Sequence, residues 1–97
     1  MYHIEFDPSA LEDLKSLKKA DQHMVIDRID AQLRHEPLVE TRNRKRLRPN
    51  LVAEWEMRVG DLRVFYNVSE ETLSVRIEAI GIKLGNRLFI RGEKREL

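Results

Sequence analysis

The 97-residue sequence predicts an α+β fold, in which a twisted, mainly antiparallel sheet carries an αα-hairpin on one face. Three observations indicate this fold. Residues 55–66 alternate apolar and polar side chains on both sides of Gly60-Asp61, as a β-hairpin does. Two helical patterns precede the hairpin, and residues 73–80 alternate again after it. The predicted order is β-α-α-β-β-β, in a single domain of residues 1–97, because this length supports one core but not two.

The first forty residues predict a short strand and two helices. Residues 2–6 alternate as a strand, and Asp7-Pro8 begins a helix, because an aspartate caps free amides and proline needs no N–H partner there. The second helix is expected after Asp21 and ends before Pro37. The predicted apolar stripes are Ala10, Leu11, Leu14 and Leu17 in the first helix and Val25, Ile26, Ile29 and Leu33 in the second. So short a joint between them predicts an αα-hairpin.

The remaining residues predict a sheet with two different faces. Residues 36–50 are polar and irregular, with a short edge strand expected near Arg46. In the hairpin, one face gathers apolar side chains: Trp55, Met57, Val59, Leu62, Val64 and Tyr66. The other face holds Glu54, Glu56, Arg58, Arg63 and Asn67. The next strand is expected to place Leu73, Val75, Ile77 and Ala79 on the apolar face. We therefore predict helices on the apolar face and an open, polar opposite face.

Composition excludes several classes of protein. There are no cysteines, which rules out disulfides, thiolate metal sites and cysteine nucleophiles. His3, His23 and His35 lack the spacing of metal ligands, so no metal is expected. No apolar run reaches membrane-spanning length, and the first residues do not resemble a signal peptide. These features predict a cytoplasmic protein with no membrane association.

Charge is uneven along the chain although its net value is only +1. Residues 42–48 contain five basic side chains, Arg42, Arg44, Lys45, Arg46 and Arg48. A run of this kind concentrates affinity for phosphate on one edge. The alternative interpretation is a solvated loop. Its position just before the polar-faced hairpin favours a phosphate-binding role.

Three segments together resemble a known family: KRLRP, EMRVGDLRVFY and VRIEAIGIKLGNRLF. They are similar to the RelE/ParE superfamily of toxins from type II toxin–antitoxin systems, and the resemblance covers nearly the whole chain. It implies a cognate antitoxin as partner. RelE-like members are ribosome-dependent mRNA endonucleases that need no metal or other cofactor, whereas ParE-like members share the fold and inhibit DNA gyrase. We favour the RelE-like branch, an mRNA interferase that inhibits translation.

The resemblance implies a role for each matching residue. Arg63 would stabilise the charge that develops on the scissile phosphate, and Arg58 matches a further basic position. Lys83 would protonate or neutralise the leaving oxygen. Other nuclease branches of the superfamily use a glutamate as base, a role open here to Glu54 or Glu56, and we include Glu56 in the site. The residues expected to bind RNA are Arg44, Lys45, Arg46, Arg48, Arg87 and Phe89.

The sequence also departs from the RelE prototype. Glu54 and Glu56 stand where the prototype has lysines, and Phe89 stands where it has a tyrosine that stacks on the base. These departures leave two alternatives open, a ParE-like gyrase inhibitor and a degenerate toxin retained as an antitoxin-binding module. In the alternative interpretation the glutamates are surface partners of nearby arginines, and Arg63 is the cross-strand partner of Glu56 or Glu78.

Overall fold

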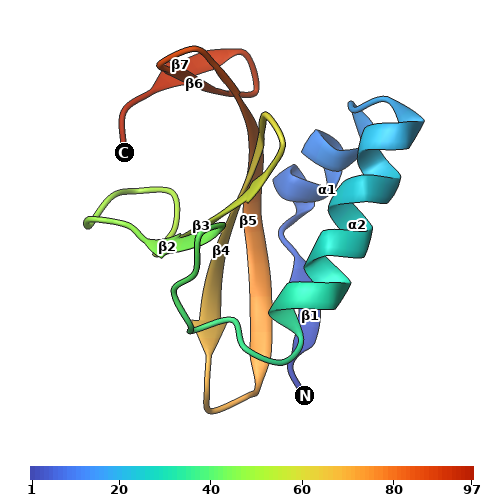
Figure 1. The fold of residues 1–97 in the computed structure, drawn as a ribbon, viewed down its shortest axis with the longest axis vertical. Coiled ribbons are helices and arrows are strands. Elements are labelled where there is room, and N and C mark those ends of the chain that lie inside the picture. The colour runs from blue at the N-terminus through green and yellow to red at the C-terminus, as the bar shows by residue number, and fades with distance from the viewer.

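The computed structural model describes all residues 1–97 and has two helices against a seven-stranded sheet (Figure 1). The elements, in chain order, are β1 (His3–Phe6), α1 (Pro8–Lys15), α2 (Lys19–Leu33), β2 (Arg44–Arg46), β3 (Trp55–Val59), β4 (Leu62–Ser69), β5 (Ser74–Leu84), β6 (Arg87–Ile90) and β7 (Glu93–Arg95). Strands β2 to β7 are antiparallel neighbours in sequence order, and β1 pairs with β5 in parallel. The predicted α+β class, with helices before an antiparallel sheet, is confirmed.

Both helices form where the sequence predicts them, with narrower buried stripes. Asp7 caps α1, and its carboxylate accepts a hydrogen bond from the Ser9 amide at 3.0 Å. Helix α2 begins at Lys19, three residues before the predicted start. Two predicted core residues, Leu11 and Ile26, are exposed. Each lies next to the buried stripe of its own helix. These stripes are Ala10, Asp13 and Leu14 in α1, and Val25, Ile29 and Leu33 in α2.

The β3–β4 hairpin is confirmed with its predicted faces. Gly60 has φ of +60°, which a tight turn between these strands requires. All six apolar hairpin residues named above are buried in the main core, which also holds Val25, Ile29 and Leu33 of α2. Trp55 and Tyr66 stack with ring centroids 6.0 Å apart, and the Tyr66 hydroxyl donates a hydrogen bond to the Pro37 carbonyl. This pair fixes the edge of the sheet against the loop that follows α2.

Strand β5 differs from its predicted pattern at two points. Phe65 pairs with Ala79, but the next residue Tyr66 pairs with Ile77, so Glu78 is an extra residue in a β-bulge. The bulge reverses the alternation, and Ala79 therefore lies on the face away from the helices, not on the apolar face as predicted. Leu73 was also assigned wrongly, because it lies in the preceding turn with φ of +50° and is exposed.

The prediction of an open second face is wrong. On this side, which we call the distal face, a second core forms from Ala53, Phe65, Ala79, Leu88 and Ile90. Strands β6 and β7 form a hairpin that curls over this face, toward the loop that joins β2 to β3 (Figure 1). The distal face is thus a partly covered surface with a recess. None of the helices is long and apolar enough to cross a membrane.

Candidate functional site

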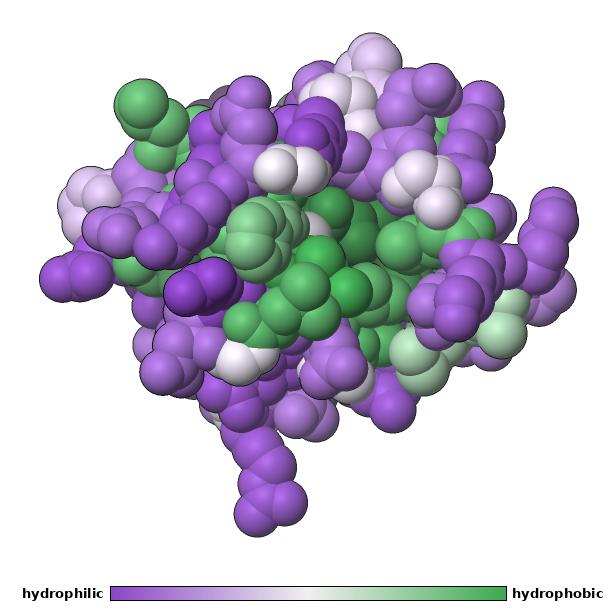
Figure 2. Space-filling view, turned by 90° about the horizontal axis from the view of Figure 1, so that it is seen from above, coloured by the Kyte–Doolittle hydropathy of each residue, from purple (hydrophilic) through white to green (hydrophobic).

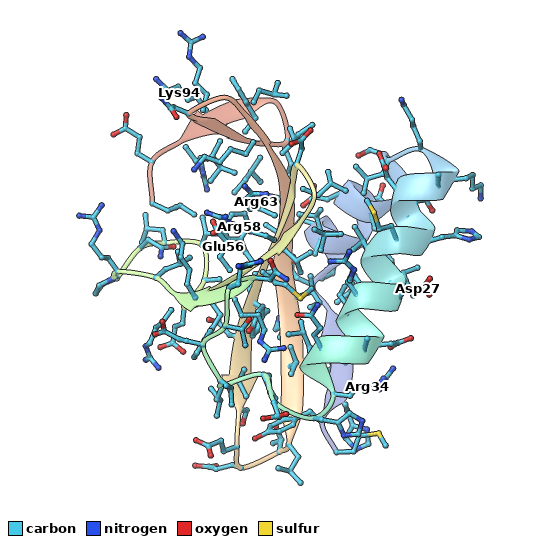
Figure 3. The ribbon with its side chains drawn as sticks, in the orientation of Figure 1. Asp27, Arg34, Glu56, Arg58, Arg63 and Lys94 are labelled. Atoms are coloured by element: carbon cyan, nitrogen blue, oxygen red, sulfur yellow. The ribbon has the colours of Figure 1, made fainter.

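The distal face carries polar side chains in rows across the sheet. In one row Lys45 of β2 pairs with Glu56 of β3, which in turn pairs with Phe65 of β4. In the adjacent row Arg58 lies directly opposite Arg63. Figure 3 shows Glu56, Arg58 and Arg63 one beyond the other on the side of the sheet away from the helices. Because side chains alternate between the faces of β3 and β4, one carboxylate and two guanidinium groups lie on one surface.

Glu56 lies in a cleft of about 220 Å³ between two parts of the sheet. The walls of this cleft, which we call the distal cleft, are Lys45, Leu47, Glu56, Lys83, Asn86, Leu88, Arg95, Glu96 and Leu97. The Glu56 side chain is only 11% exposed, and its carboxylate lies 3.8 Å from the Lys45 ammonium. This separation is too long for a hydrogen bond, so the carboxylate oxygens keep free lone pairs. A partly buried carboxylate with free lone pairs suits proton transfer.

Arg58 and Arg63 form an unbalanced pair of cations beside this cleft. Two guanidinium groups directly opposite each other destabilise a sheet. Neither forms an ion pair, and Arg63 Nη1 instead donates to the carbonyls of Gly60 and Leu62 at 2.8 and 2.9 Å. The predicted partnership of Arg63 with Glu56 or Glu78 does not form. Arg63 is buried and held by its own turn, whereas Arg58 is exposed. Neither has an internal acid, so the pair leaves positive charge free to attract an external anion.

The basic run divides between the two faces, because it forms a strand. Arg44 is buried on the helix side, where Nε donates to the Val39 carbonyl and Nη1 to the backbone and side-chain oxygens of Gln32. Its inclusion among surface RNA-binding residues is therefore wrong. Arg46 lies 6.0 Å from the Trp55 ring and pairs with Glu54 at 3.7 Å.

Only Lys45 of that strand reaches the distal cleft. Arg48, in the loop after β2, lies beside the chain terminus, with Nη2 3.5 Å from the Leu97 carbonyl oxygen. The structure thus brings together Lys45, Glu56 and Lys83 of the predicted site residues, with Arg58 and Arg63 in the next row.

Phe89 and Arg87 lie elsewhere. Phe89 pairs with Ile82, on the opposite side of the sheet from Lys83. It lines an apolar groove of about 350 Å³ between α1 and strands β5 and β6, together with Leu17, Leu62, Ile80, Ile82 and Leu84. Figure 2 shows apolar side chains gathered in a central hollow with a hydrophilic rim. Arg87 is exposed at the start of β6 and lines neither the groove nor the distal cleft.

Shifted pKa values occur away from the distal cleft. Hydrogen bonds from Ser9 and Arg76 lower the pKa of Asp7 to about 2. The Asp7 contact in turn raises the pKa of Arg76, which also pairs with Glu78. Burial raises the pKa of the Tyr66 phenol. Asp7 and Arg76 link the start of α1 to β5, and Tyr66 links β4 to the loop after α2. None of these groups lines the cleft. No group of three or more His, Asp or Glu side chains is placed to hold a metal ion.

The sequence did not predict the positions of two residues, Arg95 and Asp13. Arg95 lines the distal cleft from β7, a strand that a charged run of residues does not predict. Asp13 is buried in α1, where its carboxylate accepts from the Ile80 amide at 3.0 Å and pairs with Arg91 at 3.0 Å. An aspartate one position before Leu14 of the apolar stripe was a weak signal for Asp13. Nothing in the sequence pointed to Arg95.

Comparison with known proteins agrees with the fold and defines the family. Residues 4–83 match the family described as ParE toxin of type II toxin–antitoxin system, parDE. The chain therefore belongs to the RelE/ParE superfamily of toxins of type II toxin–antitoxin systems. No curated protein sequence matches it.

Three solved structures are similar to this chain. The toxin–antitoxin complex RelBE2 of Mycobacterium tuberculosis has a chain with 28% identity and a TM-score of 0.73, covering 84% of this chain and 98% of its own. The isolated RelE toxin of E. coli has 20% identity and a TM-score of 0.70, over 87% of this chain and 86% of its own. The archaeal RelE–RelB complex of Pyrococcus horikoshii has 24% identity and a TM-score of 0.65, over 95% and 97%. The last two likenesses concern the fold alone.

Proposed function

We propose that this toxin is a ribosome-dependent mRNA endonuclease that inhibits translation. The observation that carries the proposal is the distal face itself, where a partly buried carboxylate, Glu56, lies among cations that have no strong internal partner. RNA cleavage through its own 2′-hydroxyl needs a base, cations around the phosphate and help for the leaving oxygen. The distal face offers a side chain for each requirement.

In the proposed reaction Glu56 accepts the proton of the 2′-hydroxyl. The 2′-oxygen then forms a bond to the adjacent phosphorus, and the bond from phosphorus to the 5′-oxygen breaks. The products are a 2′,3′-cyclic phosphate and a 5′-hydroxyl, whose proton comes from Lys83 or from water held by it. The 3.8 Å separation of Glu56 from Lys45 leaves the carboxylate free to accept that proton.

The cations supply electrostatic stabilisation of the pentavalent phosphorane. Arg63 is held rigidly by the carbonyls of Gly60 and Leu62, so its remaining N–H groups are fixed in direction. A planar guanidinium grips two phosphate oxygens at once, and Arg58 adds charge from the opposite position. A site already ordered before substrate binds loses little free energy to reorganisation.

A second candidate function is inhibition of DNA gyrase. The observation that favours it is the match of residues 4–83 to a family described by its ParE toxin. In that case the distal face would have no catalytic role, and substitution of Glu56 by glutamine would leave toxicity unchanged.

We further propose a cognate antitoxin as the partner of this chain. Similar structures from Mycobacterium tuberculosis and Pyrococcus horikoshii are toxin–antitoxin complexes. Two aliphatic residues of the apolar groove, Ile82 and Leu84, are 38% and 54% exposed. Covering them with an amphipathic antitoxin segment would remove apolar surface from water.

Induction of the toxin in cells tests both functions together. Primer extension on abundant transcripts would reveal new 5′ ends within codons if mRNA is cleaved, while plasmid supercoiling stays normal. The Arg63→Ala variant should lower cleavage by about 10²- to 10³-fold, as loss of one oxyanion donor does. Intact transcripts together with relaxed plasmid would instead establish the gyrase function.

A further inference from the structure

The β6–β7 hairpin lies outside the residues 4–83 that match the family. It nevertheless forms one wall of the distal cleft, through Leu88 and Arg95. Gly81 permits this arrangement, because a Cβ there would lie 2.7 Å from the Phe89 carbonyl oxygen and 3.0 Å from Ile90. Only a residue without a side chain lets β6 fold this closely over the distal face.

The hairpin is fixed on both of its sides. Leu88 and Ile90 pack into the second core against Phe65. On the helix side Arg91, at the turn between β6 and β7, pairs with the buried carboxylate of Asp13 at 3.0 Å. Because the same carboxylate accepts the Ile80 amide, the turn is linked to both α1 and β5. Side chains on β7 are therefore held at defined positions relative to β5.

Strand register places Arg95 next to the proposed catalytic groups. Lys83 pairs with Leu88, and Leu88 pairs with Arg95, so the three side chains share one row and one face. Lys83 and Arg95 are two strand spacings apart along this row, about 10 Å. Both line the distal cleft with Glu56.

The Arg95 guanidinium is also available for a ligand. Its only ion pair is with Glu93, at 4.0 Å, and the Glu93 side chain is 78% exposed. An ion pair this long and this exposed contributes little to stability. By contrast, Arg44 and Arg91 are occupied by close internal oxygens.

We propose that Arg95 binds a phosphate of the RNA next to the scissile one, so that the β6–β7 hairpin extends the substrate site beyond strands β2 to β5. The inference rests on the proposed endonuclease function. A guanidinium about two strands from Lys83 contacts a flanking phosphate and not the reacting one. Arg95 is thus a binding residue, whose loss weakens RNA affinity more than it slows the chemical step.

The experiment compares Arg95→Ala, Arg95→Lys and Lys94→Ala in the full-length toxin. Lys94, labelled at β7 in Figure 3, is the matched control, because it neighbours Arg95 in the strand, carries the same charge and does not line the distal cleft. Affinity is measured on ribosomes programmed with an mRNA whose decoding-site codon carries 2′-O-methyl groups, which block cleavage. Rates are measured on the unmodified mRNA, and thermal unfolding checks each fold.

We expect Arg95→Ala to weaken binding and raise KM about tenfold with kcat nearly unchanged, and Arg95→Lys to recover part of the loss. The slope of log affinity against log salt should fall by about 0.7, the value for one phosphate contact on a single strand. If Arg95→Ala matches Lys94→Ala while wild type cleaves mRNA, the inference fails and the endonuclease function stands. If wild type binds but does not cleave, and Arg95→Ala binds less, Arg95 keeps its role and the endonuclease function fails. Wild type that neither binds nor cleaves overturns both.

Discussion

The two faces of strand β5 carry side chains of opposite character near its C-terminal end. Toward the helices it presents Ile80, Ile82 and Leu84 to an apolar groove, while one residue away along the chain Lys83 faces a charged cleft. We have proposed the cleft as the site for RNA and the groove as the site for an antitoxin. Strand β5 contributes to both surfaces because successive side chains point to opposite sides.

The basic run shows that strand alternation decides which surface a charged residue reaches. Arg44, Lys45 and Arg46 are adjacent in sequence, yet only Lys45 enters the distal cleft. Arg44 instead fastens the residues after α2 to the sheet through Gln32 and Val39. A basic run therefore predicts a phosphate-binding surface only after its strand alternation is known.

The largest expected effect is a loss of mRNA cleavage when the carboxylate of the distal cleft is replaced. Glu56→Gln should lower mRNA cleavage by about 10²- to 10⁴-fold, because general-base catalysis contributes this much, while leaving antitoxin binding intact. Glu54→Gln is the matched control, since Glu54 is exposed and pairs with Arg46 outside the cleft. Single-turnover cleavage of ribosome-bound mRNA gives the rates. Equal rates for the two variants would remove Glu56 from the mechanism.

A smaller effect is expected on antitoxin affinity when a charge is placed in the apolar groove. Leu84→Glu should weaken antitoxin binding about 10- to 100-fold, because a charge replaces apolar surface that the antitoxin would cover, and leave cleavage unchanged. Leu51→Glu is the control, because Leu51 is fully exposed on the β2–β3 loop and lies outside the groove. Isothermal titration with the antitoxin measures both affinities. The same loss in both variants would argue against the groove as the contact surface.

Reversing one charge of the facing arginine pair should separate stability from activity. Arg58→Glu places a carboxylate opposite Arg63, which should raise the free energy of unfolding by about 0.2 to 1 kcal/mol. Cleavage should fall, because the new carboxylate competes with phosphate for Arg63. Urea unfolding and the cleavage assay report the two effects. Arg28→Glu, on the exposed side of α2, controls for the change in net charge.

The smallest expected effect concerns acid stability at the β1–α1 junction. The pKa of Asp7 is lowered from 3.8 to about 2, so its ionised form is favoured in the folded state. Its contribution is therefore fully present above about pH 4 and is lost as pH falls toward 2. Asp7→Asn, which keeps a helix-capping oxygen, should show a shallower loss of Tm over that interval. Circular dichroism at several pH values measures it, and identical profiles would contradict the link.

Much of the fold is predictable because it depends on local periodicity. The hairpin at Trp55–Tyr66 and the helix start at Asp7-Pro8 follow from alternation, capping and turn chemistry. The bulge at Glu78 does not, since one extra residue changes no local pattern but moves Ala79 to the distal face. The fold-back of β6 also escapes, because it depends on Gly81 meeting Phe89 across the sheet.

The candidate site likewise contains residues that could be placed from local alternation and residues that could not. Glu56, Arg58 and Arg63 could be assigned to one face from hairpin alternation alone, and the structure places them there. Arg44 and Phe89 could not be placed, because their faces depend on strand pairing with β3 and β5. Arg95 depends on a strand that forms only through its pairing with β6.

The most direct test of the account is the chemistry of the cut ends. Purified toxin is added to a reconstituted translation system with one defined mRNA, and the fragments are mapped and their termini analysed. The account predicts cleavage only when ribosomes are present, with 2′,3′-cyclic phosphate and 5′-hydroxyl ends and with activity lost in Glu56→Gln but not in Glu54→Gln. Intact mRNA, or cleavage that does not depend on Glu56, would contradict it.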